Sequence, residues 1–237
     1  MSTQQEPERG AAPVAAGRRV SVVVFDLDGV LVDSFGVMRQ AFDLAYAEVV
    51  GDGEAPFAEY NRHLGRYFPD IMRIMGLPLE MEAPFVRESY RLAHEVRVFA
   101  GAREVVSALR DSGFGLAVAT GKSGPRARSL LERLDLLRLF DHVIGSDEVA
   151  RPKPAPDIVL RAMSLLGAVP DEVIMVGDAV TDIESARDAG VAAVAALWGE
   201  TDEAALMRAK PDVTLRKPED LLEWLGLDQP ELASSGR

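Results

Sequence analysis

The stretch Val20-Ser-Val-Val-Val-Phe-Asp-Leu-Asp-Gly29 joins a short apolar run to two carboxylates. A continuous run of mainly β-branched residues predicts a strand buried on both faces, as in a parallel sheet. Asp26 and Asp28 follow this run directly. Packing explains them poorly, because ionised groups near a core are costly unless they are paired or bound to a metal. The stretch therefore predicts a buried parallel strand that ends at a chemical site.

Two later stretches have the same design. Residues 115–119 form an apolar run that ends at Thr120, and residues 173–176 form another that ends at Gly177 and Asp178. Further strand patterns lie at 142–145, 191–197 and 212–215, with helical patterns between the strands at 125–137, 155–166 and 182–189. Alternating strands and helices predict an α/β fold with a doubly wound parallel sheet.

One interval interrupts this alternation. About 75 residues separate the first strand from the next core helix, whereas a βα loop typically has about 2–6 residues. The interval has helical patterns at 35–50, 57–64, 68–75 and 83–98. We therefore expect a helical cap at 33–99, placed over the carboxyl ends of the strands, where open α/β sheets bind ligands. The core then comprises 20–32 and 100–225, with a disordered leader at 1–19 and a tail at 226–237.

A second pair of carboxylates follows the strand at 173–176. Asp178 and Asp182 stand in Gly177-Asp-Ala-Val-Thr-Asp182, and they converge with Asp26 and Asp28 if the two strands are neighbours in the sheet. A cluster of oxygen ligands without His or Cys favours a hard cation, most simply Mg²⁺. Such a rim could hold a phosphate while one carboxylate attacks it. A purely structural role, as the N-cap of a helix, is the alternative for Asp182.

The phosphate oxygens of such a site need positive and neutral donors. Thr120 ends the second strand, and Lys153 stands between two prolines. Only four of the 26 Lys and Arg residues are lysines, so a lysine at this place is informative. A compact ammonium on a rigid segment suits a single-point phosphate contact. Lys122 and the backbone N–H of Gly121 are weaker candidates for substrate contacts.

Four segments of this chain resemble, in order and spacing, the motifs of the haloacid dehalogenase superfamily, specifically its capped phosphatases. The segments are Asp26-Leu-Asp-Gly-Val-Leu-Val-Asp-Ser34, Thr120-Gly-Lys122, Lys153-Pro and Gly177-Asp-Ala-Val-Thr-Asp182. The resemblance covers roughly residues 20–225. It implies a Mg²⁺-dependent phosphatase with a small phosphorylated molecule as its substrate.

The resemblance also implies roles for single residues. Asp26 matches the nucleophile that forms an aspartyl-phosphate, and Asp28 matches the general acid and base. Thr120 and Lys153 match the groups that bind the phosphate and the intermediate.

The metal ligands follow from the same resemblance. Asp178 matches the direct Mg²⁺ ligand, beside the carboxylate of Asp26 and the main-chain carbonyl of Asp28, and Asp182 supports it. One position departs from the pattern, because many relatives have Asn where this chain has Gly121. The backbone N–H remains there, but any side-chain contact with the substrate is lost.

A narrower resemblance concerns the substrate. Residues 59–70, 118–126 and 195–199 look like the phosphatases associated with 3-amino-5-hydroxybenzoate (AHBA) synthesis in ansamycin-type antibiotic clusters. This implies a sugar phosphate or sugar nucleotide of the aminoshikimate route, with kanosamine as a product. Phosphoglycolate and hexose-phosphate phosphatases share the same four motifs and stay as alternatives.

Within the expected cap, three basic residues surround Gly65. Arg62, His63 and Arg66 lie between two helical patterns, where a turn could meet an anionic or polyhydroxyl substrate when a lid closes. A solvated face of the cap is the alternative interpretation of these three side chains.

Composition excludes several classes of protein. The 237 residues carry a formal charge of −12 and include no cysteine. The acidity argues against a nucleic-acid binder, which needs basic charge. No apolar run approaches the ~18 residues of a membrane span, and residues 1–19 lack the order of charges of a signal peptide. The lack of cysteine excludes disulfides and thiol chemistry, and we expect a cytoplasmic protein. The oligomeric state is left open.

Three other functions compete with a phosphatase. A mutase of the same superfamily would have to protect its aspartyl-phosphate from water. A dehalogenase would need neither Asp28 nor the metal cluster. A non-enzymatic binding module would be expected to have lost one of the four motifs, and all four are present.

Overall fold

The computed structural model describes residues 12–14, 18–199 and 202–227. Its strands are β1 (Ala12–Val14), β2 (Arg18–Val20), β3 (Val22–Phe25), β4 (Val32–Asp33), β5 (Arg97–Val98), β6 (Gly115–Thr120), β7 (His142–Gly145), β8 (Val173–Gly177), β9 (Ala192–Ala196) and β10 (Val213–Leu215). Its α-helices are α1 (Phe35–Val49), α2 (Phe57–Asn61), α3 (Phe68–Met75), α4 (Glu82–Arg91), α5 (Ala102–Asp111), α6 (Gly124–Arg133), α7 (Asp157–Leu166), α8 (Val180–Asp188), α9 (Glu203–Arg208) and α10 (Asp220–Trp224). Short 3₁₀ helices are η1 (Leu79–Met81), η2 (Ala93–Glu95), η3 (Leu137–Leu139), η4 (Ser146–Glu148) and η5 (Pro170–Glu172).

Six strands form one parallel sheet in the order β10-β9-β8-β3-β6-β7. The first strand of the sheet in the sequence, β3, lies in the middle, and both of its neighbours are bonded to it in register, with Phe25 opposite Val118 and Val176. The predicted α/β fold with a doubly wound parallel sheet is confirmed. The order also puts β8 beside β3, as the convergence of the two acidic pairs requires.

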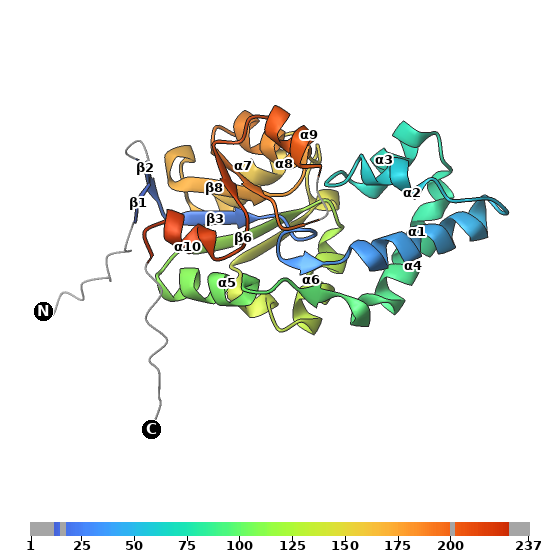
Figure 1. Ribbon diagram of the computed structural model, residues 1–237, viewed down its shortest axis with the longest axis horizontal. Helices are drawn as coiled ribbons and strands as arrows, with labels where there is room; N and C mark the ends of the chain where they lie inside the picture. The colour runs from blue at the N-terminus through green and yellow to red at the C-terminus, as the bar shows by residue number, and fades with distance from the viewer. Residues whose placement is uncertain (1–11, 15–17, 200–201, 228–237) are drawn as a thin grey trace, which may run out of the picture.

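Side chains that alternate along the strands supply two separate cores. Val23 and Phe25 face a layer that includes α5, α6 and α10, whereas Val22 and Val24 face α7, α8 and α9. Figure 1 shows these two layers of helices on opposite faces of the sheet. Burial on both faces explains why the strand sequences are continuously apolar rather than alternating.

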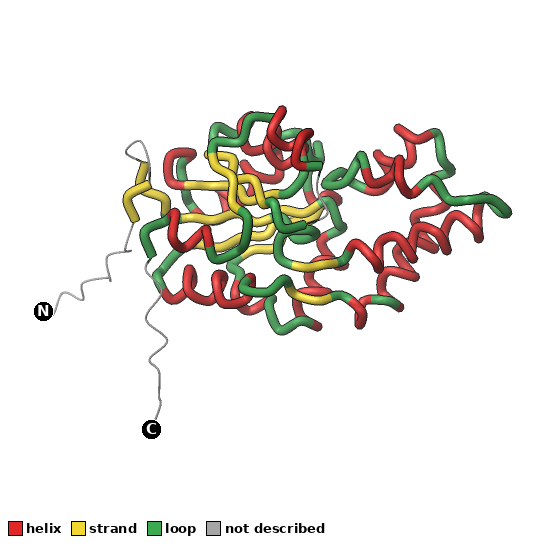
Figure 2. Tube along the Cα trace, in the orientation of Figure 1, coloured by secondary structure: helices red, strands yellow, loops and turns green. Residues whose placement is uncertain are grey.

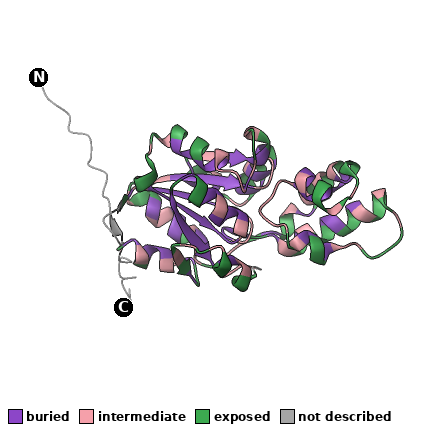
Figure 3. Ribbon diagram, turned by 90° about the horizontal axis from the view of Figure 1, so that it is seen from above, coloured by how far each residue is buried: buried purple, intermediate pink, exposed green. Residues whose placement is uncertain are grey.

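Residues 35–95 form a separate unit, which we call the helical lobe. It contains α1 to α4 with η1 and η2 and has its own apolar cluster, in which Phe42 and Met72 are fully buried. Figure 2 shows the lobe beside one end of the sheet, and Figure 3 shows buried residues within both units. Elements β1, β2 and α10 lie at the opposite end of the sheet (Figure 1).

The lobe leaves and rejoins the sheet domain through two short strands. Strands β4 and β5 pair antiparallel, with Val32 opposite Val98. The helix expected over 83–98 is therefore wrong at its end, because α4 stops at Arg91 and Arg97–Val98 is a strand. A two-residue strand has too little periodicity to be recognised in a sequence, so only its pairing reveals it.

The expected leader also differs from the structure where the structure describes it. Ala12–Val14 pairs antiparallel with Arg18–Val20, where disorder was expected. The rest of that leader, 1–11 and 15–17, and the expected tail from residue 228 onward lie outside the described residues.

Candidate active site

The site lies where β3, β6 and β8 end side by side. Asp26 follows β3, Thr120 ends β6, and Asp178 follows β8. The backbone N–H of Asp26 donates to the carbonyl of Val176 over 2.8 Å, which extends the ladder to the first catalytic candidate. Register in the sheet therefore fixes which residues meet at this rim.

Lys153 connects three parts of the rim. Its ammonium donates to Asp26 Oδ1 over 2.9 Å, to Asp182 Oδ1 over 2.6 Å and to the carbonyl of Ala119 over 3.1 Å. The side chains of Lys153 and Asp182 are fully buried. A buried lysine is tolerated only with such partners, and the two carboxylates raise the pKa of Lys153 against the effect of burial. It stays positively charged beside Asp26.

The environment of Asp26 opposes its ionisation. Burial raises its pKa to about 7, with Lys153 lowering it and Asp182 and Asp28 raising it. Burial and the neighbouring carboxylates also raise the pKa of Asp178 well above its usual range. Lys153 offsets only part of the charge of these crowded carboxylates, and a cation among them would favour their ionised forms.

Three of the four predicted metal ligands lie together. Asp26, Asp178 and Asp182 each offer a carboxylate oxygen within 4.8 Å of the others. Asp28 is not part of this group, and its carboxylate points elsewhere. The donors are all oxygens, which fits Mg²⁺. Asp182 also accepts from the N–H of Ala179 over 3.1 Å at the start of α8, which is the helix-capping role expected for it.

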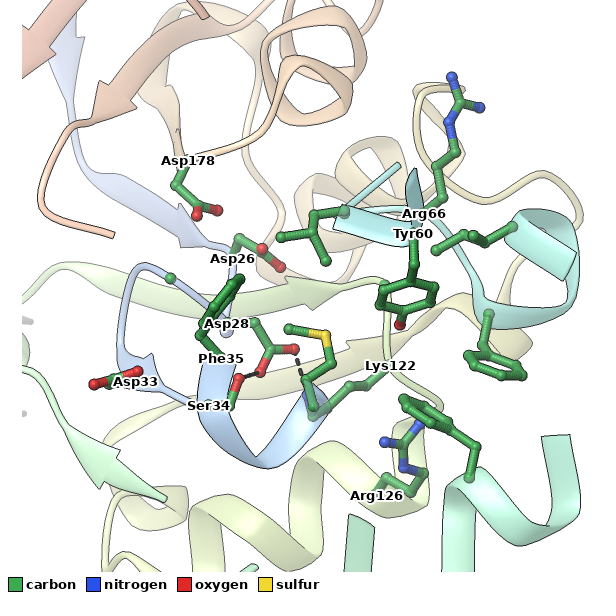
Figure 4. Close-up of a pocket in the computed structure, with 18 of the residues that line it drawn as sticks. Asp26, Asp28, Asp33, Ser34, Phe35, Tyr60, Arg66, Lys122, Arg126 and Asp178 are labelled. Carbon is green, nitrogen blue, oxygen red and sulfur yellow. Dashed lines mark hydrogen bonds and ion pairs between the residues drawn. The ribbon is translucent and has the colours of Figure 1, made fainter. Parts of the chain in front are cut away.

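The carboxylate of Asp28 is held by two other groups. Ser34 Oγ donates to Oδ1, and Lys122 Nζ donates to Oδ2 over 2.5 Å (Figure 4). Burial works against the charge of Asp28, but Lys122 and the hydrogen bond from Ser34 keep its pKa below its usual value. Burial lowers the pKa of Lys122 in turn. These contacts hold Asp28 ionised and oriented.

A pocket extends from these carboxylates toward the helical lobe. Asp26, Asp28 and Asp178 line one end, with Lys122 close to Asp28 (Figure 4). Gly121 also lines the pocket. The lobe contributes mostly apolar side chains, among them Phe35, Met38, Tyr60, Phe68 and Phe85. The lobe therefore gives the pocket a largely apolar wall.

The basic residues of the lobe do not all reach this pocket. Arg66 lines it, whereas Arg62 and His63 line a second cavity between the lobe and α8. The structure thus brings Arg66 to the pocket and leaves Arg62 and His63 outside it.

Thr120 is fully buried, and its hydroxyl accepts the N–H of Lys122 over 3.2 Å.

Gly121 and Gly65 lie at the closest approach of the two units. A Cβ on Gly121 would lie 2.7 Å from the carbonyl oxygen of Gly65 and 2.8 Å from that of Arg66. A Cβ on Gly65, whose φ is +83°, would lie 2.3 Å from Thr181 Oγ1. The glycine that replaces the usual Asn therefore makes room for the turn of the lobe.

Sequence reasoning missed several polar residues of the pocket, among them Ser34 and Arg126. Ser34 stood in the first motif without a role, and nothing in its type distinguished it. Arg126 lies in the first turn of α6, where the helix dipole disfavours a cation. That position was a usable signal, because a basic residue there needs another reason.

Within the described residues, the helices are all too short or too polar to cross a bilayer.

Comparisons with known proteins agree with this geometry. A family model described as haloacid dehalogenase-like hydrolase matches residues 20–190. The protein of Dickeya dadantii named "Probable phosphatase IndB" is 37% identical over 204 residues, which are 81% of this chain and 87% of that protein. The phosphoglycolate phosphatase of Salmonella typhimurium is 32% identical over 232 residues, 86% of this chain and 92% of that protein.

A solved structure shares the whole architecture. The crystal structure of a hydrolase from Pseudomonas syringae has a TM-score of 0.77 and 25% sequence identity, and the match covers 87% of this chain and 98% of that one. Fold and sequence thus indicate the same family.

Proposed function

Because the chain belongs to the haloacid dehalogenase-like hydrolases, we propose that it cleaves phosphate monoesters through a covalent intermediate on Asp26. That it is a phosphoric monoester hydrolase related to phosphoglycolate phosphatases follows from its relatives. The covalent route is supported by one observation above all: Asp26 lies buried at the pocket end with Lys153 Nζ 2.9 Å away.

The proposed reaction has two steps. Asp28 is ionised in the free site, so in this proposal it takes up a proton as the substrate binds. A carboxylate oxygen of Asp26 then attacks the phosphorus in line, the ester P–O bond breaks, and the leaving alkoxide takes that proton from Asp28. Water then attacks the aspartyl-phosphate, Asp28 takes a proton from that water, and phosphate leaves with Asp26 restored. Lys153 offsets charge on the transferring group, and Lys122 keeps Asp28 oriented between the steps.

We propose Mg²⁺ as the cofactor, held by Asp26, Asp178 and Asp182. When bound, it supplies positive charge that offsets the developing charge on the phosphoryl oxygens. The main-chain carbonyl of Asp28 is a further ligand that the family resemblance implies. Asp178 and Asp182 keep the rest of the rim acidic, so an anionic phosphate requires that cation and Lys153 together.

For the substrate we propose a small phosphorylated metabolite that enters beneath the helical lobe, which we propose acts as a cap. Phosphoglycolate and an aminoshikimate sugar phosphate are the two specific candidates, the first from the name of a relative and the second from the narrower resemblance in sequence. A phosphate-release screen over both classes chooses between them. A cytoplasmic location is proposed with them, on the composition alone.

The central experiment measures hydrolysis of 4-nitrophenyl phosphate with Mg²⁺, with excess EDTA, and with Asp26→Asn. We expect EDTA and Asp26→Asn each to lower kcat/KM roughly a thousandfold or more, since one removes the cation and the other the nucleophile. Asp43→Asn removes an exposed carboxylate on α1 and is the matched control. Activity that survives both treatments contradicts the mechanism.

A further inference from the structure

Arg126 is a buried cation that the proposed mechanism does not use. It lies in the first turn of α6 and is only 9% exposed. Of the residues that the structure describes, none forms a hydrogen bond or an ion pair with its guanidinium. The nearest acidic group of the site, Asp28, already receives bonds from Ser34 and Lys122. Arg126 therefore has spare donors.

Aromatic side chains of the helical lobe hold this guanidinium in place. Its Cζ lies 5.1 Å from the ring centroid of Phe85, and Phe85 stacks on Phe68 at 4.1 Å with an interplanar angle of 14°. A cation over a ring face is stabilised, but the ring offers no hydrogen-bond acceptor in the guanidinium plane. The stacked rings of Phe85 and Phe68 therefore hold the guanidinium of Arg126 in position but accept no hydrogen bond from its N–H groups in the guanidinium plane.

Arg126 borders the pocket that contains Asp26. It also borders a third cavity, which lies between α4 and α6. Figure 4 shows Arg126 near Lys122, on the other side of the pocket from Asp178. A ligand that carries its phosphate to the acidic rim would therefore extend its other end toward Arg126.

Energetics favour an anion at that other end. A buried charge without a hydrogen-bonded partner is costly, and a guanidinium binds carboxylates and phosphates through two parallel bonds. An incoming carboxylate would satisfy donors that the protein leaves open, whereas a neutral group would gain less.

We infer that Arg126 is a specificity-determining residue that binds a second anionic group on the substrate, a carboxylate or a second phosphate, at the end away from the cleaved ester. This rests on the proposed function, because it assumes that the phosphate to be cleaved sits at Asp26. It narrows the substrate class to phosphate monoesters whose leaving group is itself an anion.

The anion site has a second consequence for catalysis. Its arginine comes from the sheet domain and its supporting ring, Phe85, from the lobe. The site is therefore complete only when the lobe is docked, so a substrate with the second anion also favours the closed arrangement.

The test compares esters that differ only in that anion. One pair is phosphoglycolate and its amide, and the other is 4-carboxyphenyl phosphate and 4-carbamoylphenyl phosphate. A fifth substrate, 1,4-phenylene bisphosphate, tests whether the second anion can be a phosphate. We expect the native enzyme to prefer the anionic member of at least one pair or the bisphosphate. Arg126→Met should lower kcat/KM for that preferred ester roughly ten- to hundredfold, while the amides change less than about threefold.

Two further variants serve as controls for this test. Arg133→Met removes an exposed cation from the same helix and should leave all the ratios unchanged. Arg126→Lys keeps the charge but loses the paired geometry, and it should restore part of the preference. Circular dichroism compares the folding of each variant with that of the native enzyme.

The outcomes separate the inference from the proposed function. Equal kcat/KM for carboxylate, amide and bisphosphate esters in the native enzyme overturns the inference, even if Arg126→Met does not fold. An equal loss on amides and anions in a folded Arg126→Met also overturns it. Failure of the proposed function looks different, because then hydrolysis of all the esters survives Asp26→Asn.

Discussion

Gly29 joins Asp28 to the rest of the first motif in a left-handed conformation, with a φ of +76°. A Cβ at this position would lie 1.9 Å from Asp178 Oδ2. Glycine is thus required twice over, by its backbone conformation and by the carboxylate of the neighbouring strand. The close approach brings the loops after β3 and β8 together at the rim.

We predict that Gly29→Ala lowers kcat at least tenfold, because the new methyl displaces Asp178, and destabilises the fold by about 1–2 kcal/mol from backbone strain. The matched control is Gly76→Ala. Gly76 has a φ of +67° and open space around a Cβ, so it suffers the strain alone. Steady-state kinetics and urea unfolding separate the two effects. Equal kcat in both variants would show that Asp178 is not displaced.

Among single residues, the sequence predicted those that stand in the four family motifs. Asp26, Lys153, Asp178 and Asp182 follow strand ends or rigid segments, and the structure brings all four together. It predicted less where a residue acts through a distant partner. Arg126 and Phe85 are about 40 positions apart and belong to different units, so only the packed structure shows their contact.

The helical lobe packs around aromatic rings rather than around the sheet. Phe42 on α1 is fully buried, 4.6 Å from the ring of Tyr60 and 5.9 Å from that of Phe57. The two clusters on the faces of the sheet do not include these rings, although Val37 of α1 and Leu92 belong to one of them. The lobe can therefore lose packing without direct loss in the sheet.

We predict that Phe42→Ala costs the lobe about 3–5 kcal/mol. Amide hydrogen exchange should then speed up roughly a hundredfold in α1 and α4, while protection of β3 and β8 stays near the native level. Leu44→Ala, which truncates an exposed residue of the same helix, serves as the control. A uniform loss of protection across both units would show that they unfold together.

Elements with a clear apolar pattern were predicted, whereas the two-residue strands β4 and β5 were not. The strand expected at 142–145 and the helix expected at 68–75 have the predicted bounds. The helix expected at 125–137 is shorter and stops at Arg133, after which a 3₁₀ turn follows. Apolar residues beyond Arg133 continue the pattern because they belong to the same core, which a sequence pattern cannot distinguish from a longer helix.

In the whole molecule, the lobe and the sheet domain line one pocket together. A Cβ on Gly121 would meet the carbonyl oxygens of Gly65 and Arg66, and backbone carbonyls cannot rotate away as side chains can. The same interface aligns Arg126 with Phe85. Larger residues at this contact would therefore push the lobe away from the sheet domain.

We predict that Gly121→Ala lowers kcat/KM roughly tenfold or more, because the methyl keeps the lobe from docking. Small-angle scattering should show a larger radius of gyration at unchanged helix content. Gly36→Ala adds a methyl where nothing lies within 4 Å, and it should behave as the native enzyme. Native kinetics for Gly121→Ala would remove this contact from the closing motion.

The β4–β5 ribbon also has a consequence for how such proteins evolve. The chain enters the helical lobe at Asp33 and returns at Arg97, directly opposite. An insertion whose two ends lie side by side can be replaced by another of different length without shifting the register of any sheet strand. Gene-level exchange could thus renew what the enzyme recognises while the acidic rim stays intact, and a chimera that carries a foreign lobe should inherit its chemistry from one parent and its selectivity from both.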